Sequence, residues 1–324
     1  MPDSHAIAST ATDPSFSTIL PTLQLAWSGH SLGLAENCLR QYELARIHNY
    51  ALPGETPADL RFGIEVHSAF EAYENERAKG STHKESLRAA IRSALTSTWD
   101  SELDRPWDSG DTLKNRDSLI RTIVDYYDNF ENDPLETVRL SSTAAAVERT
   151  FELELDKTSV TGERYRLHGR KDRLVRFQDR YWTLDYKTTR KTLNRAFFAQ
   201  FSPDISVSLY AYAGQIIYGE PVAGVIIDGI QILANSTQFQ RAFIERREST
   251  LNEWLFDTEY YISLAELAAQ RNYWPQNPRA CGRIYEDPDT GKLSYGCPFR
   301  PVCASAPEIR QQLLDLNYIQ RKRT

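Results

Sequence analysis

Two acidic residues and a lysine stand close together near the middle of the chain, in segment 169–188. Asp172 precedes Asp185 and Lys187, which are two positions apart. On a β-strand the last two side chains would project from one face, because side chains alternate along a strand. Two carboxylates and a main-chain carbonyl, here that of Tyr186, are oxygen ligands that suit a hard divalent cation. Lys187 would then polarise a water molecule or offset charge on a phosphate.

A solvated strand face could contain the same residue types, since short polar patterns of this kind are frequent. Trp182 and Leu184 lie just before Asp185 and indicate a largely buried strand. A charged residue in such a strand needs a compensating partner. Gly169 has no side chain and would allow close approach of backbone or ligand. These neighbours favour a metal site.

The cysteines form a second candidate site. Cys38 lies near the start of the chain, whereas Cys281, Cys297 and Cys303 lie near its end. Four thiolates are the ligand number of a structural zinc site or of an iron–sulfur cluster. We expect reduced thiols and no disulfides, as in an intracellular protein. Four unrelated buried cysteines are the remaining alternative.

Composition bounds the function classes. The chain has 324 residues, 41% of them hydrophobic, and a formal net charge of −6. This charge argues against a protein that coats nucleic acid through a global positive field, but it is compatible with carboxylate ligands and a local basic groove. The sequence has no apolar run of membrane-spanning length, and its first residues do not resemble a signal peptide. We therefore expect a soluble, cytoplasmic protein.

Hydrophobic periodicity changes at about residue 130. The first part is mainly helical, and the later part alternates strands with helices, which is typical of an α/β layered domain. Helices are expected at 34–50, 58–79, 83–98, 111–130, 206–218, 251–270 and 308–321. Strands are expected at 146–155, 165–177, 180–186, 223–233 and, as a hairpin partner, 238–247, with 276–305 irregular.

We expect four parts along the chain. Residues 1–20 form a disordered tail. Residues 21–135 form a helical N-terminal portion that contains Cys38 and His67, and 136–275 form the core. Residues 276–324 form a cysteine-rich region that packs back on the N-terminal helix.

The spacing Gly169-x-x-Asp172, followed by Asp185-Tyr186-Lys187-Thr188, resembles the core signature of RecB-type nucleases of the PD-(D/E)XK superfamily. The resemblance implies a restriction-endonuclease-like fold, in which a mixed central sheet is flanked by helices. It also implies that Asp172, Asp185 and Lys187 are catalytic and that the cofactor is Mg²⁺ or Mn²⁺.

Other positions extend the resemblance. Gly63 and His67, four residues later, resemble the helix motif of this family, in which the histidine binds metal. Glu148 resembles the acidic strand position that precedes the Asp motif and is a candidate for contacting substrate. The family also places a Gln four residues before a Tyr on a following helix. Here Tyr210 fits, but Ser206 occupies the Gln position, so Ser206 or a nearby Ser202 or Gln200 would make the contact, or activity is reduced.

The cysteine layout resembles the iron–sulfur staple of CRISPR-associated exonucleases and AddB-type helicase-nucleases. This implies one [4Fe–4S] cluster held by Cys38, Cys281, Cys297 and Cys303, with structural Zn²⁺ as the alternative. The Cys-x5-Cys spacing of Cys297 and Cys303 matches the family. The 15 residues between Cys281 and Cys297 replace the usual Cys-x2-Cys and predict an extruded loop, 282–296.

The resemblance therefore implies a metal-dependent DNA nuclease, an exonuclease in DNA processing, recombination or repair. Its expected partner is DNA that is single-stranded or has free ends, together with a helicase or recombination protein. The sequence has no Walker-type phosphate loop, so ATP-driven unwinding would come from another protein. The alternatives are a catalytically reduced relative that binds DNA or a partner, and a nuclease specialised for RNA or for a structured junction.

Overall fold

The computed structural model describes residues 13–54, 56–218, 221–286 and 293–321. The chain divides into two compact units. The cysteine unit comprises Met1–Gly54, Glu152–His168 and Leu255–Thr324, and the sheet unit comprises Glu55–Phe151 and Gly169–Trp254. The expected boundaries at 135 and 275 are not those of the units. Cys38 and His67, expected in one N-terminal portion, belong to different units.

The sheet unit is built on a mixed sheet, as the sequence predicts. Strands β9 and β10 are antiparallel, β10 and β11 are parallel, and β11 and β12 are antiparallel. The hairpin partner expected for β11 is therefore confirmed. Two further strands, β5 and β8, pair with β9. The strands are β5 (Glu136–Thr137), β8 (Val147–Thr158), β9 (Arg164–Phe177), β10 (Arg180–Thr189), β11 (Val222–Ile232) and β12 (Thr237–Glu245).

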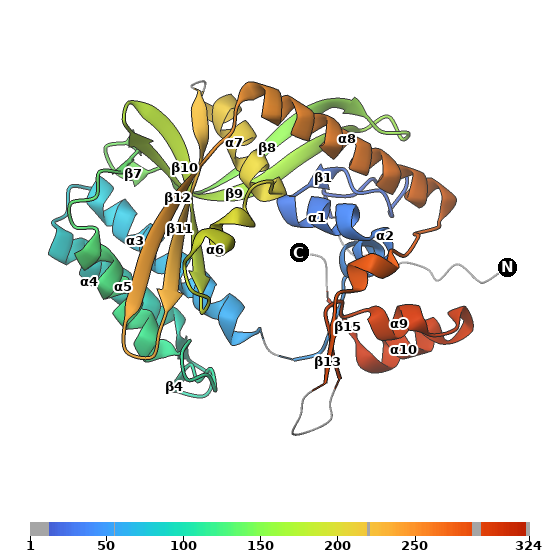
Figure 1. Ribbon diagram of the computed structural model, residues 1–324, viewed down its shortest axis with the longest axis horizontal. Helices are drawn as coiled ribbons and strands as arrows, with labels where there is room; N and C mark the ends of the chain where they lie inside the picture. The colour runs from blue at the N-terminus through green and yellow to red at the C-terminus, as the bar shows by residue number, and fades with distance from the viewer. Residues whose placement is uncertain (1–12, 55, 219–220, 287–292, 322–324) are drawn as a thin grey trace. The chain divides into compact units, whose positions relative to one another are not determined.

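Helices cover both faces of this sheet (Figure 1). On one face, Phe62, Phe70 and Tyr126 pack with Ile226 of β11 in a large core cluster. On the other face, helix α7 packs Val207 against the alternate residues of β11. Burial on both faces explains why β11 is mainly apolar, with Asp228 and Gln231 as its buried polar residues. The helices are α3 (Ala58–Ala78), α4 (His83–Ser97), α5 (Arg116–Asn129), α6 (Arg195–Ala199) and α7 (Ile205–Tyr218).

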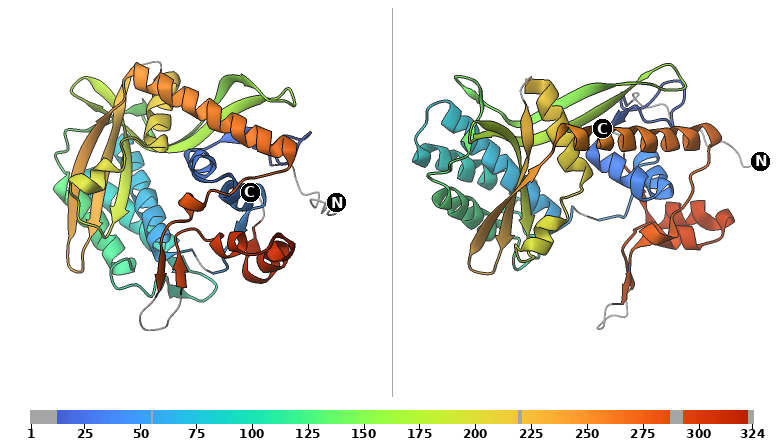
Figure 2. Two further views of the ribbon diagram at one scale, coloured as in Figure 1. Left: turned by 45° about the vertical axis from the view of Figure 1, so that its right-hand side comes forward. Right: turned by 45° about the horizontal axis from the view of Figure 1, so that its top comes forward.

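The cysteine unit joins the two ends of the chain. Strand β15 pairs antiparallel with β2, and Nε of Arg40 donates a hydrogen bond to the carbonyl of Trp274 at 2.8 Å. The C-terminal region thus contacts the first helices, and α9 and α10 lie side by side (Figures 1 and 2). The elements are β1 (Ala26–Trp27), α1 (Gly29–Asn37), α2 (Leu39–Tyr42), a π-helix (Glu43–Ile47), β2 (Tyr50–Ala51), α8 (Glu248–Arg271, which starts in the sheet unit), β13 (Ile284–Glu286), β14 (Leu293–Tyr295), α9 (Arg300–Ala304), α10 (Arg310–Asn317) and β15 (Ile319–Gln320).

Several predicted elements are corrected by the structure. The helix expected at 34–50 begins earlier and is interrupted at Cys38, whose backbone is extended, with φ −164° and ψ 114°. The helix expected from 111 starts at Arg116, because Asp111 first forms a turn by accepting hydrogen bonds from the amides of Leu113 and Lys114. The closing helix ends at Asn317, because the chain then enters β15.

Two further expectations change. Segment 276–305 is not irregular throughout, since it contains the hairpin β13–β14 and α9. Part of the expected disordered tail, 1–12, lies outside the described residues. The rest of that tail is ordered: Phe16 is 5% exposed and pairs with Gln24. Among the residues described, no helix has the length and apolar character needed to span a membrane.

Candidate functional site

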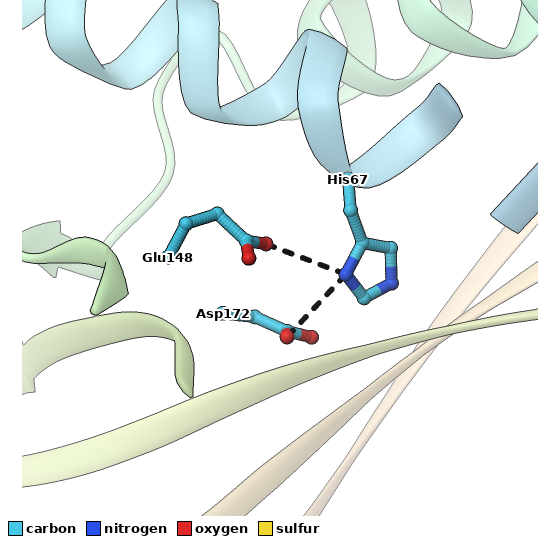
Figure 3. Close-up of side chains that lie close together, drawn as sticks. All are labelled: His67, Glu148 and Asp172. Atoms are coloured by element: carbon cyan, nitrogen blue, oxygen red, sulfur yellow. Dashed lines mark ion pairs between the residues drawn. The ribbon is translucent and has the colours of Figure 1, made fainter. Parts of the chain in front are cut away.

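Three side chains from separate elements of the sheet unit converge on one point (Figure 3). His67 comes from α3, Glu148 from β8 and Asp172 from β9. Nδ1 of His67 lies 3.3 Å from Oδ1 of Asp172 and 3.4 Å from Oε1 of Glu148. One ligand atom from each residue lies within 4.8 Å of the others. An imidazole and two carboxylates at this spacing can hold a transition metal or Mg²⁺.

One face of α3 positions His67 against β10. Asp59, Gly63 and His67 recur every four residues and so share that face. Asp59 pairs with the buried ammonium of Lys114 at 2.9 Å, and that ammonium also lies 3.4 Å from Oγ1 of Thr188. A Cβ at Gly63 would lie 3.6 Å from the same oxygen. Nε2 of His67 lies 3.2 Å from the carbonyl oxygen of Tyr186, the carbonyl expected to face the metal.

Asp172 interrupts the ladder between β9 and β10. The paired register ends at Arg173 and Leu184. Beyond that pair, Oδ2 of Asp172 accepts a hydrogen bond from the amide of Tyr186 at 2.8 Å. The carboxylate therefore replaces a backbone partner, which satisfies a buried amide and fixes the side chain beside the next catalytic candidates on β10.

Asp185 and Lys187 project from the same face of β10, as their spacing predicts. Nζ of Lys187 lies 2.7 Å from Oδ2 of Asp185. The Asp185 side chain is 6% exposed, whereas that of Lys187 is 39% exposed. Lys187 can therefore reach solvent or substrate while its carboxylate partner stays buried.

The site is strongly coupled electrostatically. Burial alone would lower the pKa of His67, but the Asp172 and Glu148 carboxylates outweigh it and raise that pKa to about 10. Burial favours the protonated form of Asp172, yet His67 and Lys187 hold its pKa below the ordinary value. Burial raises the pKa of Asp185 to about 6 despite the nearby Lys187 ammonium. Burial opposes the charge of Lys187, but Asp185 and Asp172 keep its pKa above the ordinary value.

Glu148 lies deeper in the site than the sequence indicates. The sequence makes it a candidate for contacting substrate, and in the structure its carboxylate lies with His67 and Asp172 in a group that could hold a metal ion. Its backbone adopts φ +48°, in the left-handed region, and its side chain is 7% exposed. Such a conformation in a residue other than glycine is concentrated at functional sites. No local sequence signal predicts this backbone, because the surrounding pattern is that of an ordinary strand.

Tyr210 and Ser206 lie on α7, in its first two turns. Burial, followed by the charges of Asp185 and Asp172, raises the pKa of Tyr210. The hydroxyl of Tyr210 therefore interacts electrostatically with both carboxylates. Ser206 is half-buried. Nε2 of Gln200 already donates to the carbonyl of Phe197 at 2.7 Å. Gln200 is therefore less available than Ser206 for the contact that a Gln makes in the PD-(D/E)XK resemblance.

All four cysteines line one cavity of about 190 Å³ in the cysteine unit. All four are free thiols. The amide of Asn277 donates to Sγ of Cys38 at 3.3 Å, and the extended backbone of Cys38 is the break between α1 and α2. Burial raises the pKa of Cys297 and Cys303, and the neighbouring cysteines raise it further.

The 15-residue separation between Cys281 and Cys297 is spanned by a β-hairpin. Strands β13 and β14 pair antiparallel, and the amide of Cys297 donates to the carbonyl of Cys281 at 3.0 Å. Gly282 and Gly296 touch at the base of the hairpin, where a Cβ on Gly296 would lie 2.9 Å from Cα of Gly282. The hairpin thus places Cys281 beside Cys297, as a short Cys-x2-Cys turn would. Its tip, 287–292, lies outside the described residues.

A family model described as the PD-(D/E)XK nuclease superfamily matches residues 26–304 of the chain. Among solved structures, the chain is similar to a candidate exonuclease from Eubacterium rectale, at 11% identity and a TM-score of 0.46, over 87% of this chain and 96% of that one. It is also similar to SSO0001, at 14% identity and a TM-score of 0.26, over 60% and 74% of the two chains. A comparison with curated proteins gave no match.

Proposed function

Since the chain belongs to the PD-(D/E)XK nuclease superfamily, we propose that it is a divalent-metal-dependent DNA nuclease, and more narrowly an exonuclease of the RecB type. The observation that carries this proposal is the convergence of His67, Glu148 and Asp172 on one point. Asp185 and Lys187 stand beside that point on β10. The proposed substrate is DNA with free ends or in single strands, in processing, recombination or repair.

The residues present fit a divalent cation. The side chains of Glu148, Asp172 and Asp185 are 7%, 9% and 6% exposed. Buried carboxylates are costly unless they are compensated. The proposed ligands are these three residues, His67 and the carbonyl of Tyr186. A bound Mg²⁺ or Mn²⁺ would supply Lewis-acid stabilisation of charge on the phosphate.

Lys187 and Tyr210 have separate tasks in this proposal. Lys187 keeps its proton at neutral pH, because Asp185 and Asp172 raise its pKa. It therefore acts as a fixed ammonium that binds a phosphate oxygen or orients the attacking water, and not as a general base. Tyr210, with its pKa raised by burial and the same carboxylates, remains a neutral phenol that can donate a hydrogen bond.

The test is a digestion time course on end-labelled single- and double-stranded DNA, with Mg²⁺, Mn²⁺ or EDTA. We expect cleavage with either cation and none in EDTA. Higher activity is expected with Mn²⁺, because an imidazole ligand suits it better than Mg²⁺. If the protein binds DNA but does not cut it with either cation or any end structure, it is the catalytically reduced relative. Ser206 at the family's Gln position favours that alternative.

A helicase or recombination protein in the cytoplasm is the partner class proposed.

For the cysteine site, we propose one [4Fe–4S] cluster held by Cys38, Cys281, Cys297 and Cys303. All four cysteines line one cavity of about 190 Å³, which supports one shared metal site. The family resemblance of the Cys-x5-Cys spacing of Cys297 and Cys303 favours a cluster over structural zinc. A bound cluster would supply covalent cross-links between the two chain ends.

Colour and metal content test the cysteine proposal. Protein purified without oxygen should be brown, with a broad visible absorbance that bleaches on oxidation and with iron and sulfide in equal amounts. Colourless protein with one zinc per chain would establish the structural-zinc alternative instead.

A further inference from the structure

Arg170 lies at the rim of the candidate metal centre and is not used by the proposed chemistry. It precedes Asp172 by two positions on β9. Its Nε lies 2.5 Å from Oε2 of Glu148, and its Nη2 lies 3.3 Å from Oε2 of Glu71. The Arg170 side chain is 55% exposed. Among the described residues, no hydrogen bond uses its Nη1, so the exposed guanidinium keeps donors for a further partner.

The two carboxylates of Glu148 and Glu71 hold Arg170 with different strength. Glu71 is on α3, one turn after His67, and its side chain is 34% exposed. An ion pair at such exposure contributes little to binding, because solvent screens it. Glu148 is buried, and its two oxygens are divided between His67 and Arg170. Arg170 and His67 are therefore the two cationic partners of Glu148.

A guanidinium is suited to a different partner in this position. Its planar fork matches two oxygens of a phosphate, and it remains charged at any working pH. When Glu148 contributes to a cation site, its charge no longer requires Arg170. The guanidinium then has only the weak contact with Glu71 to break before it can bind an anion at the rim of the metal centre.

We propose that Arg170 binds a phosphate of the DNA substrate at the edge of the metal centre, and that it is released for this task when Glu148 exchanges it for the divalent cation. The inference rests on the proposed nuclease function and adds a substrate-binding residue to it. Arg170 thereby couples two events: DNA is held firmly at this rim only when the site is loaded with metal.

The test is DNA affinity, measured as a function of salt in a Lys187→Ala background that does not cut. Fluorescence anisotropy with a labelled single-stranded oligonucleotide gives the slope of log K against log[KCl], in constant Mn²⁺ or in EDTA. Each lost phosphate contact reduces the slope by about 0.7 for single strands. With Mn²⁺, Arg170→Ala should lower affinity roughly tenfold and reduce the slope by about that amount. In EDTA both quantities should stay at the values of the background protein.

Two variants make the result specific. Arg176→Ala is the matched control, because Arg176 is on the same strand, is 53% exposed and pairs with a carboxylate, Asp179. It should leave both slopes unchanged. Arg170→Lys keeps the positive charge but loses the planar fork of the guanidinium. In Mn²⁺ it should therefore keep the salt slope of the background protein and recover part of the affinity. This variant also keeps the test informative if Arg170→Ala misfolds.

An Arg170→Ala slope equal to that of its background in Mn²⁺ would overturn the inference, as would an equal reduction in Mn²⁺ and in EDTA. Failure of the proposed function is a separate result, seen in the protein with Lys187 intact as the absence of cleavage in the digestion assay.

Discussion

Nδ1 of His67 lies 3.3 Å from Oδ1 of Asp172, although one residue comes from a helix and the other from a strand far along the chain. The same nitrogen lies 3.4 Å from Oε1 of Glu148. This contact is an ion pair, because the two carboxylates outweigh burial and raise the pKa of His67 to about 10. A cation that coordinates His67 must therefore displace a proton.

Metal affinity should consequently depend on pH. One proton is released per cation bound through neutral imidazole. Between the Asp185 pKa of about 6 and the His67 pKa of about 10, we expect the Mn²⁺ affinity to rise about tenfold per pH unit. Calorimetry in buffers of different ionisation enthalpy measures the released proton, and His67→Asn should abolish both effects. An affinity that is constant from pH 7 to pH 9 would contradict this reading of the site.

The stability of the metal-free protein should fall as pH rises. The folded-state pKa of His67 is raised from 6.5 to about 10, so its contribution is complete below pH 6.5 and is lost as pH rises through about 10. Asp185 acts with the same sign at lower pH, because burial raises its pKa from 3.8 to about 6. In EDTA the melting temperature should decline across both windows. His67→Gln should flatten the upper decline and leave the lower one.

Asp185→Asn and Lys187→Ala should separate metal binding from chemistry. Asp185→Asn removes the negative charge of a proposed metal ligand and should therefore weaken Mn²⁺ binding. Cleavage should fall about 100-fold or more. In EDTA it should stabilise the fold, because it removes a buried carboxylate. Lys187→Ala should reduce cleavage to a similar degree without weakening metal binding. Cleavage at the parent rate by both variants would mean that the site is elsewhere.

Two glycines of the recognised motifs should respond in opposite ways. A Cβ on Gly63 would make only an ordinary contact, 3.6 Å from Oγ1 of Thr188. Gly63→Ala should therefore be tolerated and should stabilise α3 by up to about 1 kcal/mol, the helix-propensity difference. A Cβ on Gly169 would lie 2.8 Å from the ring of Phe151. Gly169→Ala should cost about 1–3 kcal/mol, as overpacked cores do. Urea unfolding of both variants measures the two values.

The sheet and its catalytic candidates were predictable because their signals are local. Hydrophobic periodicity predicts β9 to β12, and period two predicts that Asp185 and Lys187 share a face. Other features depend on contacts made far along the chain. Helical spacing continues smoothly through Leu34, Cys38 and Tyr42, so the extended backbone of Cys38 has no local signal.

The ligand group shows the same limit. The acidic character of Glu148 is visible in the sequence, but its position against His67 depends on a left-handed backbone that only the assembled sheet and α3 stabilise. Similarly, the sequence shows a separation between Cys281 and Cys297, whereas the pairing of β13 with β14 closes it. Tertiary contacts, not propensity, determine both.

The cysteine site offers a test of whether its four residues act as one unit. If Cys38 and Cys303 hold the same inorganic core, removing either one releases it, and removing both adds nothing. We expect Cys38→Ala and Cys303→Ala each to lower the melting temperature by more than about 5 °C, the shift that ~2 kcal/mol produces in a chain of this size. The double variant should melt where the single variants do. Four unrelated buried thiols would instead give shifts that add, and a Cys38→Ala protein that melts at the parent temperature would exclude a shared site.

Gly296→Ala provides a control that leaves every thiol in place. Its Cβ would press on the base of the hairpin beside Cys281. It should lower the iron or zinc content without removing a ligand, and reconstitution with excess metal should restore part of the stability.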